Sequence, residues 1–265
     1  MRICHVVFAG IGRSDEDLLK LVDCDDGAYD LDAAKAGGIV ALIREQITAA
    51  KAASGLIGKI DVQLLIANIP SLAPALQAVT AGLGAPTGAP RPARLKHTLL
   101  GYWFRWAGID GMTNPFGLEV LVNPDLLPVE VPFVASHEWA HLAGFATESE
   151  ASYVGWLACR RGDAWAQYSG WLFLYWQLAG DLAPETRARL ASALGPIPRA
   201  DIEAIADRLR RGHIPLLQTG SWRVYDQYLK ANRVASGVRS YGEVVTLVLR
   251  ARTTSDGMPV RRPRG

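Results

Sequence analysis

Apolar side chains recur every three or four positions along most of the chain, which is the spacing of helices that bury one face in a core. In the first such segment Ile39, Ile43 and Ile47 fall on one side, while Arg44 and Lys51 lie mainly on the other. The pattern predicts a largely helical protein. The predicted helical segments cover residues 32–50, 72–79, 95–107, 132–143, 148–159, 163–180, 185–212 and 244–249.

One segment alternates with the period of a strand. Asn114–Pro124 is bounded by turn residues, with Glu119 and Leu121 on one face and Val120 and Val122 on the other. Residues 60–69 fit a strand or a buried helix equally well. We therefore expect an α+β fold that is predominantly α-helical, with a small sheet edge ahead of the helix at 132–143.

The clearest loop is the Gly- and Pro-rich stretch Gly84–Pro92, which is the natural place for a domain boundary. It divides the chain into a mostly helical region at residues 1–94 and a second domain at 95–252. Residues 253–265 are rich in Pro, Arg and Gly and are expected to form a flexible tail. The alternative is one compact domain throughout.

The composition excludes several classes of protein. Of the 265 residues, 49% are hydrophobic and 20% charged, and the net charge of +2 gives no reason to expect nucleic acid as a partner. Three cysteines without a CxxC pair predict no disulfide framework and weakly favour a reducing, cytoplasmic compartment. No apolar run is long enough for a transmembrane helix. The aromatic stretches at 95–107 and 163–180 are expected to pack on the core, with contact to a membrane surface as the alternative.

The most informative motif is His137-Glu138-Trp139-Ala140-His141. Histidines four residues apart lie one above the other on a helix, so two imidazoles can bind one tetrahedral metal ion. Glu138 follows the first histidine and can take a proton from a metal-activated water without being a ligand itself. This is the HExxH arrangement of zinc metallopeptidases.

A catalytic zinc site of this kind needs a third protein ligand. Glu148 and Glu150 are the candidates, and a separation of two residues on a helix prevents both from facing the metal. Thr147 and Glu150 also match a capping box, in which Glu150 would bond only to the backbone at Thr147. The residues alone leave both assignments open.

Polar residues further along the chain are candidates to stabilise an oxyanion. Tyr228 and Tyr241 are the predicted catalytic donors, and Arg239 and His213 are alternatives.

Several short blocks occur together in one order: Asn114-Pro115-Phe116 with Glu119, Pro132-Phe133, His137-Glu138-x-x-His141-x-x-Gly144-Phe145-Ala146-x-Glu148-x-Glu150-Ala151, Tyr168-Ser169-Gly170, Tyr228-Leu229-Lys230-Ala231-Asn232 and Gly237-Val238-x-Ser240-Tyr241-Gly242. In these blocks the segment from Leu95 to about Leu249 resembles the domain-of-unknown-function 3810 family, predicted zincin-like proteins of bacteria. Ser152 stands where the family usually has Asn, and Gly117 where it often has Thr. Members also tend to carry membrane helices ahead of this region, and this sequence shows none.

The resemblance implies a zincin-like fold and a gluzincin-type site. Its ligands would be His137 and His141 with Glu150 as the acidic third ligand, and Glu138 would be the base. We therefore expect a zinc metallopeptidase that binds Zn²⁺ and acts on a peptide or protein. The alternatives are a zinc-binding regulatory protein without turnover and a hydrolase of a non-peptide amide. The sequence does not predict the oligomeric state.

Overall fold

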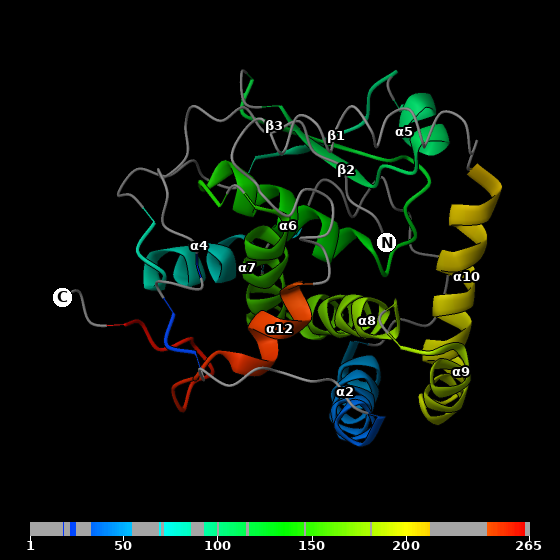
Figure 1. Cartoon of the computed structure of the whole chain (residues 1–265). Helices are drawn as coiled ribbons and strands as arrows, with labels where there is room; N and C mark the ends of the chain where they lie inside the picture. The colour runs from blue at the N-terminus through cyan, green and yellow to red at the C-terminus, as the bar shows by residue number, and fades with distance from the viewer. Residues whose placement is uncertain are drawn as a thin grey trace.

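Two helices in the middle of the chain, α6 and α7, lie side by side, and the other elements are arranged around them (Figure 1). The computed structural model describes residues 18, 22–24, 33–54, 69, 72–85, 93–99, 101–114, 117–145, 147–180, 182–212 and 243–262. The helices are α2 (Ala33–Ser54), α4 (Leu72–Gly82), α5 (Gly101–Ala107), α6 (Val131–Leu142), α7 (Glu148–Arg161), α8 (Ala164–Gly180), α9 (Pro184–Ala193), α10 (Pro196–Gly212) and α12 (Glu243–Arg250). The strands are β1 (Leu95–Lys96), β2 (Gly111–Asn114) and β3 (Glu119–Val122). The prediction of a mostly helical α+β protein is confirmed.

Helix α6 has clear start and stop signals and is buried along its whole length. Pro132 occupies the first turn, where its missing N–H is not needed. The next backbone N–H, that of Phe133, donates to Ser169 Oγ of α8 at 3.1 Å. After the helix, Gly144 adopts a φ of 102°, a left-handed conformation that suits glycine and turns the chain towards α7.

The three strands form a sheet in the order β1-β3-β2, which lies over α6. β1 is parallel to β3, whereas β2 is antiparallel to β3 with Gly111 opposite Val122 and Asn114 opposite Glu119. The predicted strand around residues 118–122 is confirmed as β3. The predicted helix at 95–107 is wrong in its first part, because β1 occupies Leu95–Lys96 and α5 begins only at Gly101.

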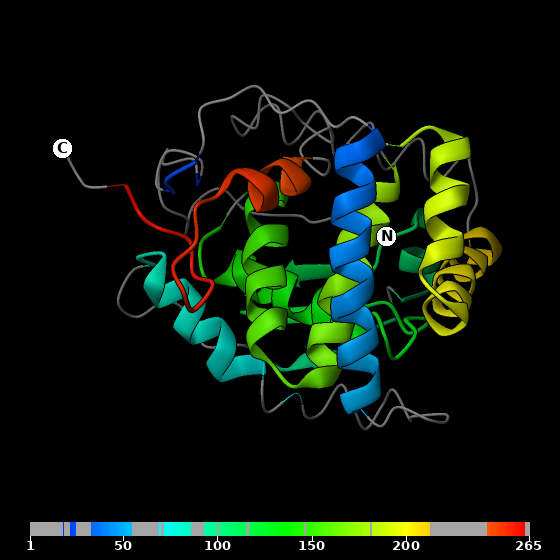
Figure 2. The same cartoon turned by 90° about the horizontal axis from the view of Figure 1, so that it is seen from below.

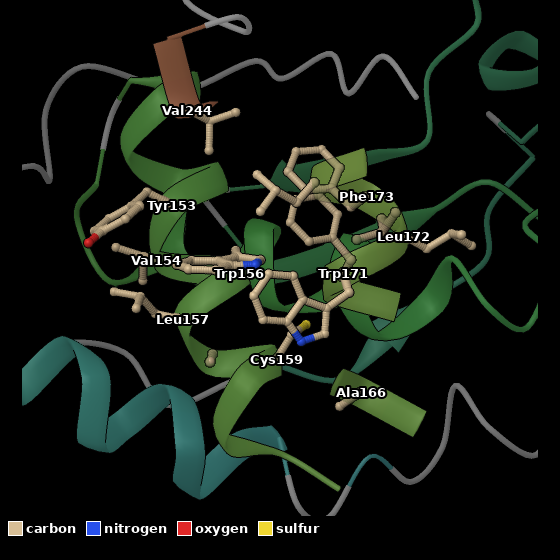
Figure 3. Close-up of a cluster of buried hydrophobic side chains, with 14 of the residues drawn as sticks. Tyr153, Val154, Trp156, Leu157, Cys159, Ala166, Trp171, Leu172, Phe173 and Val244 are labelled. Atoms are coloured by element: carbon tan, nitrogen blue, oxygen red, sulfur yellow. The ribbon is translucent and has the colours of Figure 1, made fainter. Parts of the chain in front are cut away.

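On the side of α6 away from the sheet, α7 and α8 form the next layer and α2 packs along α8 (Figures 1 and 2). Trp156 of α7 and Trp171 of α8 meet edge to face, with ring centroids 5.4 Å apart, and Val244 of α12 belongs to the same buried cluster (Figure 3). The rings of Phe133 in α6 and Phe173 in α8 are stacked, with their centroids 3.4 Å apart. The aromatic stripe of α8 therefore packs in the core, as predicted.

The described parts of residues 1–94 do not form a separate core. α2 packs on α8 and α4 packs on α7, and their buried side chains belong to the same apolar cluster as those of α6 and α7. Within the segment that is expected to form a flexible tail, the described residues make backbone contacts. Thr253 pairs with Pro259, and the backbone N–H of Asp23 donates to Val260 at 2.7 Å. Among the described helices, none has the length and apolar character needed to span a bilayer.

Candidate metal centre

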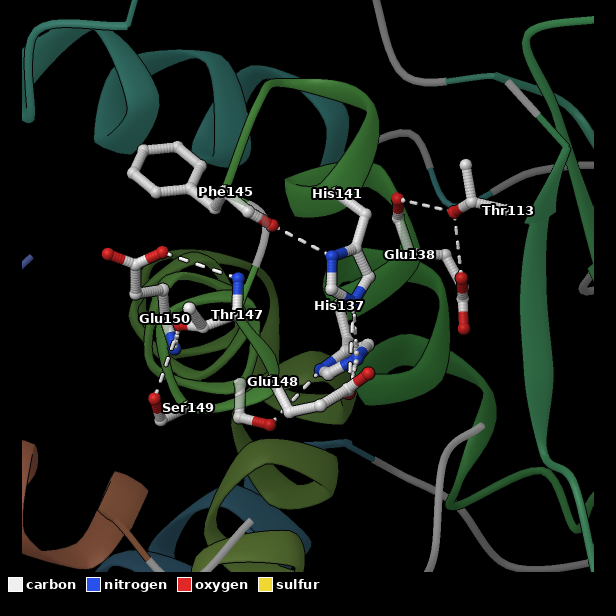
Figure 4. Close-up of polar contacts among 10 residues, drawn as sticks. Thr113, His137, Glu138, His141, Phe145, Thr147, Glu148, Ser149 and Glu150 are labelled. Carbon is white, nitrogen blue, oxygen red and sulfur yellow. Dashed lines mark hydrogen bonds and ion pairs between the residues drawn. The ribbon is translucent and has the colours of Figure 1, made fainter. Parts of the chain in front are cut away.

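The two histidines of the HExxH motif converge as the helical spacing predicts. His137 and His141 both come from α6, and their Nε2 atoms are 3.1 Å apart (Figure 4). Their rings meet edge to face with centroids 4.8 Å apart. Both nitrogens thus point to one common position beside the helix.

Glu148 lies where it could supply a third ligand atom. Its Oε2 lies 3.3 Å from His137 Nε2 and 3.8 Å from His141 Nε2, and the three residues form the one group in the described part of the chain that could hold a metal ion. Glu148 is the first residue of α7, so the acidic group comes from the helix that packs on α6. The expectation that Glu150 would complete the site therefore has to be corrected in favour of Glu148.

Glu150 has a different role. The hydroxyl of Thr147 accepts a hydrogen bond from the backbone N–H of Glu150, and the Glu150 carboxylate accepts one from the N–H of Thr147. This is the capping box that the sequence offered as the competing interpretation. The same carboxylate accepts from the backbone N–H of Leu18 at 2.6 Å, so it also fixes a distant segment to the start of α7.

The distances fit a small tetrahedral ion. Ligand bonds of about 2.0–2.2 Å, directed to the corners of a tetrahedron, place neighbouring ligand atoms about 3.3–3.6 Å apart. The observed separations of 3.1, 3.3 and 3.8 Å lie close to that range. Two histidines and one glutamate are also a donor set of catalytic zinc sites, in which the fourth position is left to water.

Hydrogen bonds to the other ring nitrogens orient both histidines. Nδ1 of His141 lies 2.7 Å from the carbonyl oxygen of Phe145, which can only accept, so Nδ1 carries the proton and Nε2 of the neutral ring presents a lone pair to the group. Nδ1 of His137 lies 3.1 Å from Ser152 Oγ, which can accept in the same way. The carbonyl contact therefore selects the metal-binding tautomer of His141, and the Ser152 hydroxyl is compatible with the same tautomer of His137.

Small residues on α7 let it approach α6 closely at this point. A Cβ atom on Gly155 would lie 3.0 Å from the backbone nitrogen of His137. Ser136 Oγ donates across the same contact to the carbonyl oxygen of Gly155 at 3.1 Å. Glu148, Ser152 and Gly155 fall at helical spacing on one face of α7, so the close contact that involves Gly155 also positions the acidic ligand.

Glu138 points to the sheet rather than to α7 (Figure 4). Its Oε2 accepts a hydrogen bond from Thr113 Oγ1 of β2 at 2.8 Å. A Cβ atom on Gly111 of the same strand would lie 2.5 Å from Glu138 Oε1, so a larger residue there would displace the carboxylate from this position. Burial raises the pKa of Glu138 to about 8, against the charges of His137 and His141 and the hydrogen bond from Thr113.

The site attracts positive charge. Burial lowers the pKa of His141, but the hydrogen bond to Glu148 and the charges of Glu148 and Glu138 outweigh it, so the pKa is raised overall. When Glu138 and Glu148 are both ionised, this buried group needs a compensating cation, whether a proton on imidazole or a metal ion.

The sequence comparisons agree with the motifs. The model of the family described as "Protein of unknown function (DUF3810)" matches residues 41–249, which is more than half of the chain. The chain belongs to the DUF3810 family. Comparison with curated proteins and with solved structures gave no match. The DUF3810 match begins within α2, well ahead of the segment that carries the quoted motifs.

Several motif residues of this DUF3810 member have positions that the sequence did not predict. Ser152, where the sequence departs from the pattern quoted for the family, contacts His137, and Ser169 accepts from the first turn of α6. Glu119 of β3 forms an ion pair with Lys96 of the neighbouring strand β1. The predicted oxyanion donors, Tyr228, Tyr241, Arg239 and His213, lie outside the described residues.

Proposed function

We propose that this DUF3810 protein is a zinc-dependent metallopeptidase. The observation that carries the proposal is the convergence of His137, His141 and Glu148 on one point, with Glu138 held next to them by β2. His137, His141 and Glu148 would hold the ion. Glu148 takes the place that the resemblance gave to Glu150.

Bound zinc would polarise the scissile carbonyl group and lower the pKa of a water molecule to about 7. Glu138 accepts the proton of the attacking water as general base and then delivers it to the leaving amine as general acid. The hydrogen bond from Thr113 keeps this carboxylate between the strand and the histidines throughout both transfers.

A peptide is the substrate class that the sheet favours. β2 is an edge strand of the described sheet, antiparallel to β3, and it carries the two residues that contact Glu138. An extended peptide can add to such an edge through main-chain hydrogen bonds, which would bring its backbone carbonyl groups past the base.

A second function, metal binding without turnover, is favoured by the burial of the site. His137, Glu138 and Glu148 are 0% exposed and His141 is 6% exposed. A substrate carbonyl reaches such a group only after a surrounding element moves. A permanently closed site would serve stability or regulation instead of hydrolysis.

The substitution Glu138→Gln separates the two functions. It preserves the three ligands and removes the base, so we expect one zinc per chain by elemental analysis and a loss of peptide cleavage of at least about 100-fold. The matched control is Glu203→Gln, which alters an exposed carboxylate on α10 and should leave cleavage unchanged. Cleavage would be followed with a mixture of internally quenched fluorogenic peptides, with and without chelator.

Cleavage by Glu138→Gln at the wild-type rate would reject Glu138 as the base. A wild-type protein that binds zinc and cleaves none of the peptides would favour the second function.

A further inference from the structure

Three charged side chains far apart in the sequence meet inside the protein, away from the candidate metal centre. One terminal nitrogen of Arg208 in α10 lies 2.7 Å from Asp110 Oδ1 and 2.6 Å from Glu130 Oε1. The Arg208 side chain is 7% exposed, and both carboxylates are 0% exposed. One guanidinium thus bridges two buried acids.

These acids stand at the ends of two elements of the site. Asp110 immediately precedes β2, and Glu130 is the N-cap residue of α6. The second oxygen of Glu130 accepts from the backbone N–H of Leu127 at 2.9 Å, which fixes the carboxylate against the chain entering the helix. Arg208 therefore joins the start of β2 to the start of α6.

The positive charge of Arg208 compensates the two buried acidic groups. Burial alone would lower the pKa of Arg208, but the charges of Asp110 and Glu130 and their hydrogen bonds raise it, so the side chain stays positive. Burial raises the pKa of Glu130 and the charge of Asp110 adds to this, whereas the charge of Arg208 and its hydrogen bond act against it. Without the guanidinium, two carboxylates would face each other in a buried position with no cation between them.

The bridge that Arg208 forms between Asp110 and Glu130 determines where β2 lies relative to Glu138. β2 continues from Asp110 to Gly111 and Thr113, which leave room for the Glu138 carboxylate and donate to it. Glu138 lies two turns further along α6 than Glu130. A shift of β2 along or away from α6 would therefore change the contact between Thr113 and the base directly.

We propose that Arg208 is a positioning residue that holds β2 in register against α6, so that Thr113 keeps the carboxylate of Glu138 in its working position. The role of Glu138 as base rests on the proposed peptidase function, but the register of β2 can be measured without it. Arg208 does not contact the three candidate ligands in any described interaction, so zinc binding should not depend on it.

The test is Arg208→Gln, with Arg105→Gln as matched control. Arg105 pairs with Asp125 near the surface and lies beside Gly212 at the end of α10, so its loss removes an arginine–aspartate pair, and none of its hydrogen bonds or ion pairs in the described part of the chain involves β2 or α6. We expect hydrogen exchange at the amides of Gly111–Asn114 to rise about tenfold or more in Arg208→Gln only, while α7 keeps its wild-type protection. Zinc content stays at one per chain.

Catalysis provides a second readout. In Arg208→Gln the kcat for the fluorogenic peptides should fall about 10- to 100-fold with little change in KM, because the base is displaced and the ligands are not. If Arg208→Gln does not fold, the same measurements are made on the triple variant Asp110→Asn, Glu130→Gln and Arg208→Met. This variant has no buried charge at the three positions, so none is left without a partner. The triple variant should show the same exposure of β2.

The outcomes separate the two proposals. Wild-type exchange at β2, or an equal effect in Arg105→Gln, would overturn the role of Arg208 while leaving the peptidase function intact. If the wild-type protein cleaves no peptide, the peptidase function fails, and local exchange at β2 alone then supports or overturns the positioning role.

Discussion

At the scale of single residues, the assignment of the acidic ligand rests on two glutamates two positions apart. Glu148 Oε2 lies within 3.8 Å of both histidine nitrogens, whereas Glu150 bonds to the backbone at Thr147 and Leu18. We expect Glu148→Gln to weaken zinc binding by at least about 100-fold. Loss of an outer hydrogen-bond partner of a ligand weakens metal affinity by up to about 100-fold, and loss of a direct ligand should weaken it at least as much. Glu150→Gln is the matched control, because glutamine also completes a capping box, and the contact that it loses, to Leu18 or Thr147, does not involve the histidines, so affinity should stay unchanged.

Competition titration with a chromophoric chelator would measure both affinities. Loss of zinc in Glu150→Gln with retention in Glu148→Gln would show that the two side chains exchange roles when the ion binds.

The same residues show what the sequence could and could not predict. Spacing alone placed His137 and His141 on one face, because that relation is internal to one helix. The choice between Glu148 and Glu150 depends on which face of α7 meets α6, which is a tertiary property. A signal was nevertheless present: Ser152 and Gly155 lie four and seven residues after Glu148, and small side chains at that spacing allow close helix packing.

At the scale of elements, the contact between α6 and α7 determines the geometry of the site. The Cβ of an alanine at 155 would press on the buried backbone of His137, which cannot move without disturbing the whole of α6. We expect Gly155→Ala to destabilise the protein by about 1–3 kcal/mol, despite the higher helix propensity of alanine. Zinc affinity should fall about tenfold, because Ser152 and Glu148 move away together with α7.

Gly38→Ala is the control for that substitution. Gly38 lies within α2, and a Cβ atom there would meet nothing within 4 Å. Alanine should therefore stabilise the protein by up to about 1 kcal/mol through helix propensity alone. Urea unfolding would measure both changes, and a stabilised Gly155→Ala would mean that the two helices can separate without cost.

Elements that depend on long-range pairing were the ones that sequence reasoning missed. β2 is four residues long and becomes a strand only because β3 pairs with it, so no periodic pattern marks it. Thr113 and Gly111 were missed with it. The spacing of apolar residues predicts the helix of α10 but not that Arg208 is buried there by partners 98 and 78 residues away. Charge pattern along one helix cannot identify partners at that distance.

At the scale of the whole molecule, one apolar core connects α2 and α4 with α6, α7 and α8. The predicted division at residue 94 does not appear in this core, and the DUF3810 match from residue 41 crosses it as well. Val22 pairs with Arg261, and Cys24 with Ala251, so described residues near the N-terminus are also joined to residues near the C-terminus. Because the described elements share this core, we expect them to unfold cooperatively as one unit.

Removal of the metal tests that cooperativity. A metal ion bound only by the folded protein adds about 4 kcal/mol of stability at a free concentration 1,000 times its Kd. For a chain of this size that corresponds to a rise in Tm of about 8–16 °C, measured by calorimetry with zinc and with chelator. Because the ligands lie on α6 and α7 at the centre of the core, we expect the entire transition to shift as a single peak. Glu148→Gln should abolish most of the shift. Two peaks, of which only one responds to zinc, would show that α2 and α4 unfold independently and would restore the predicted division of the chain.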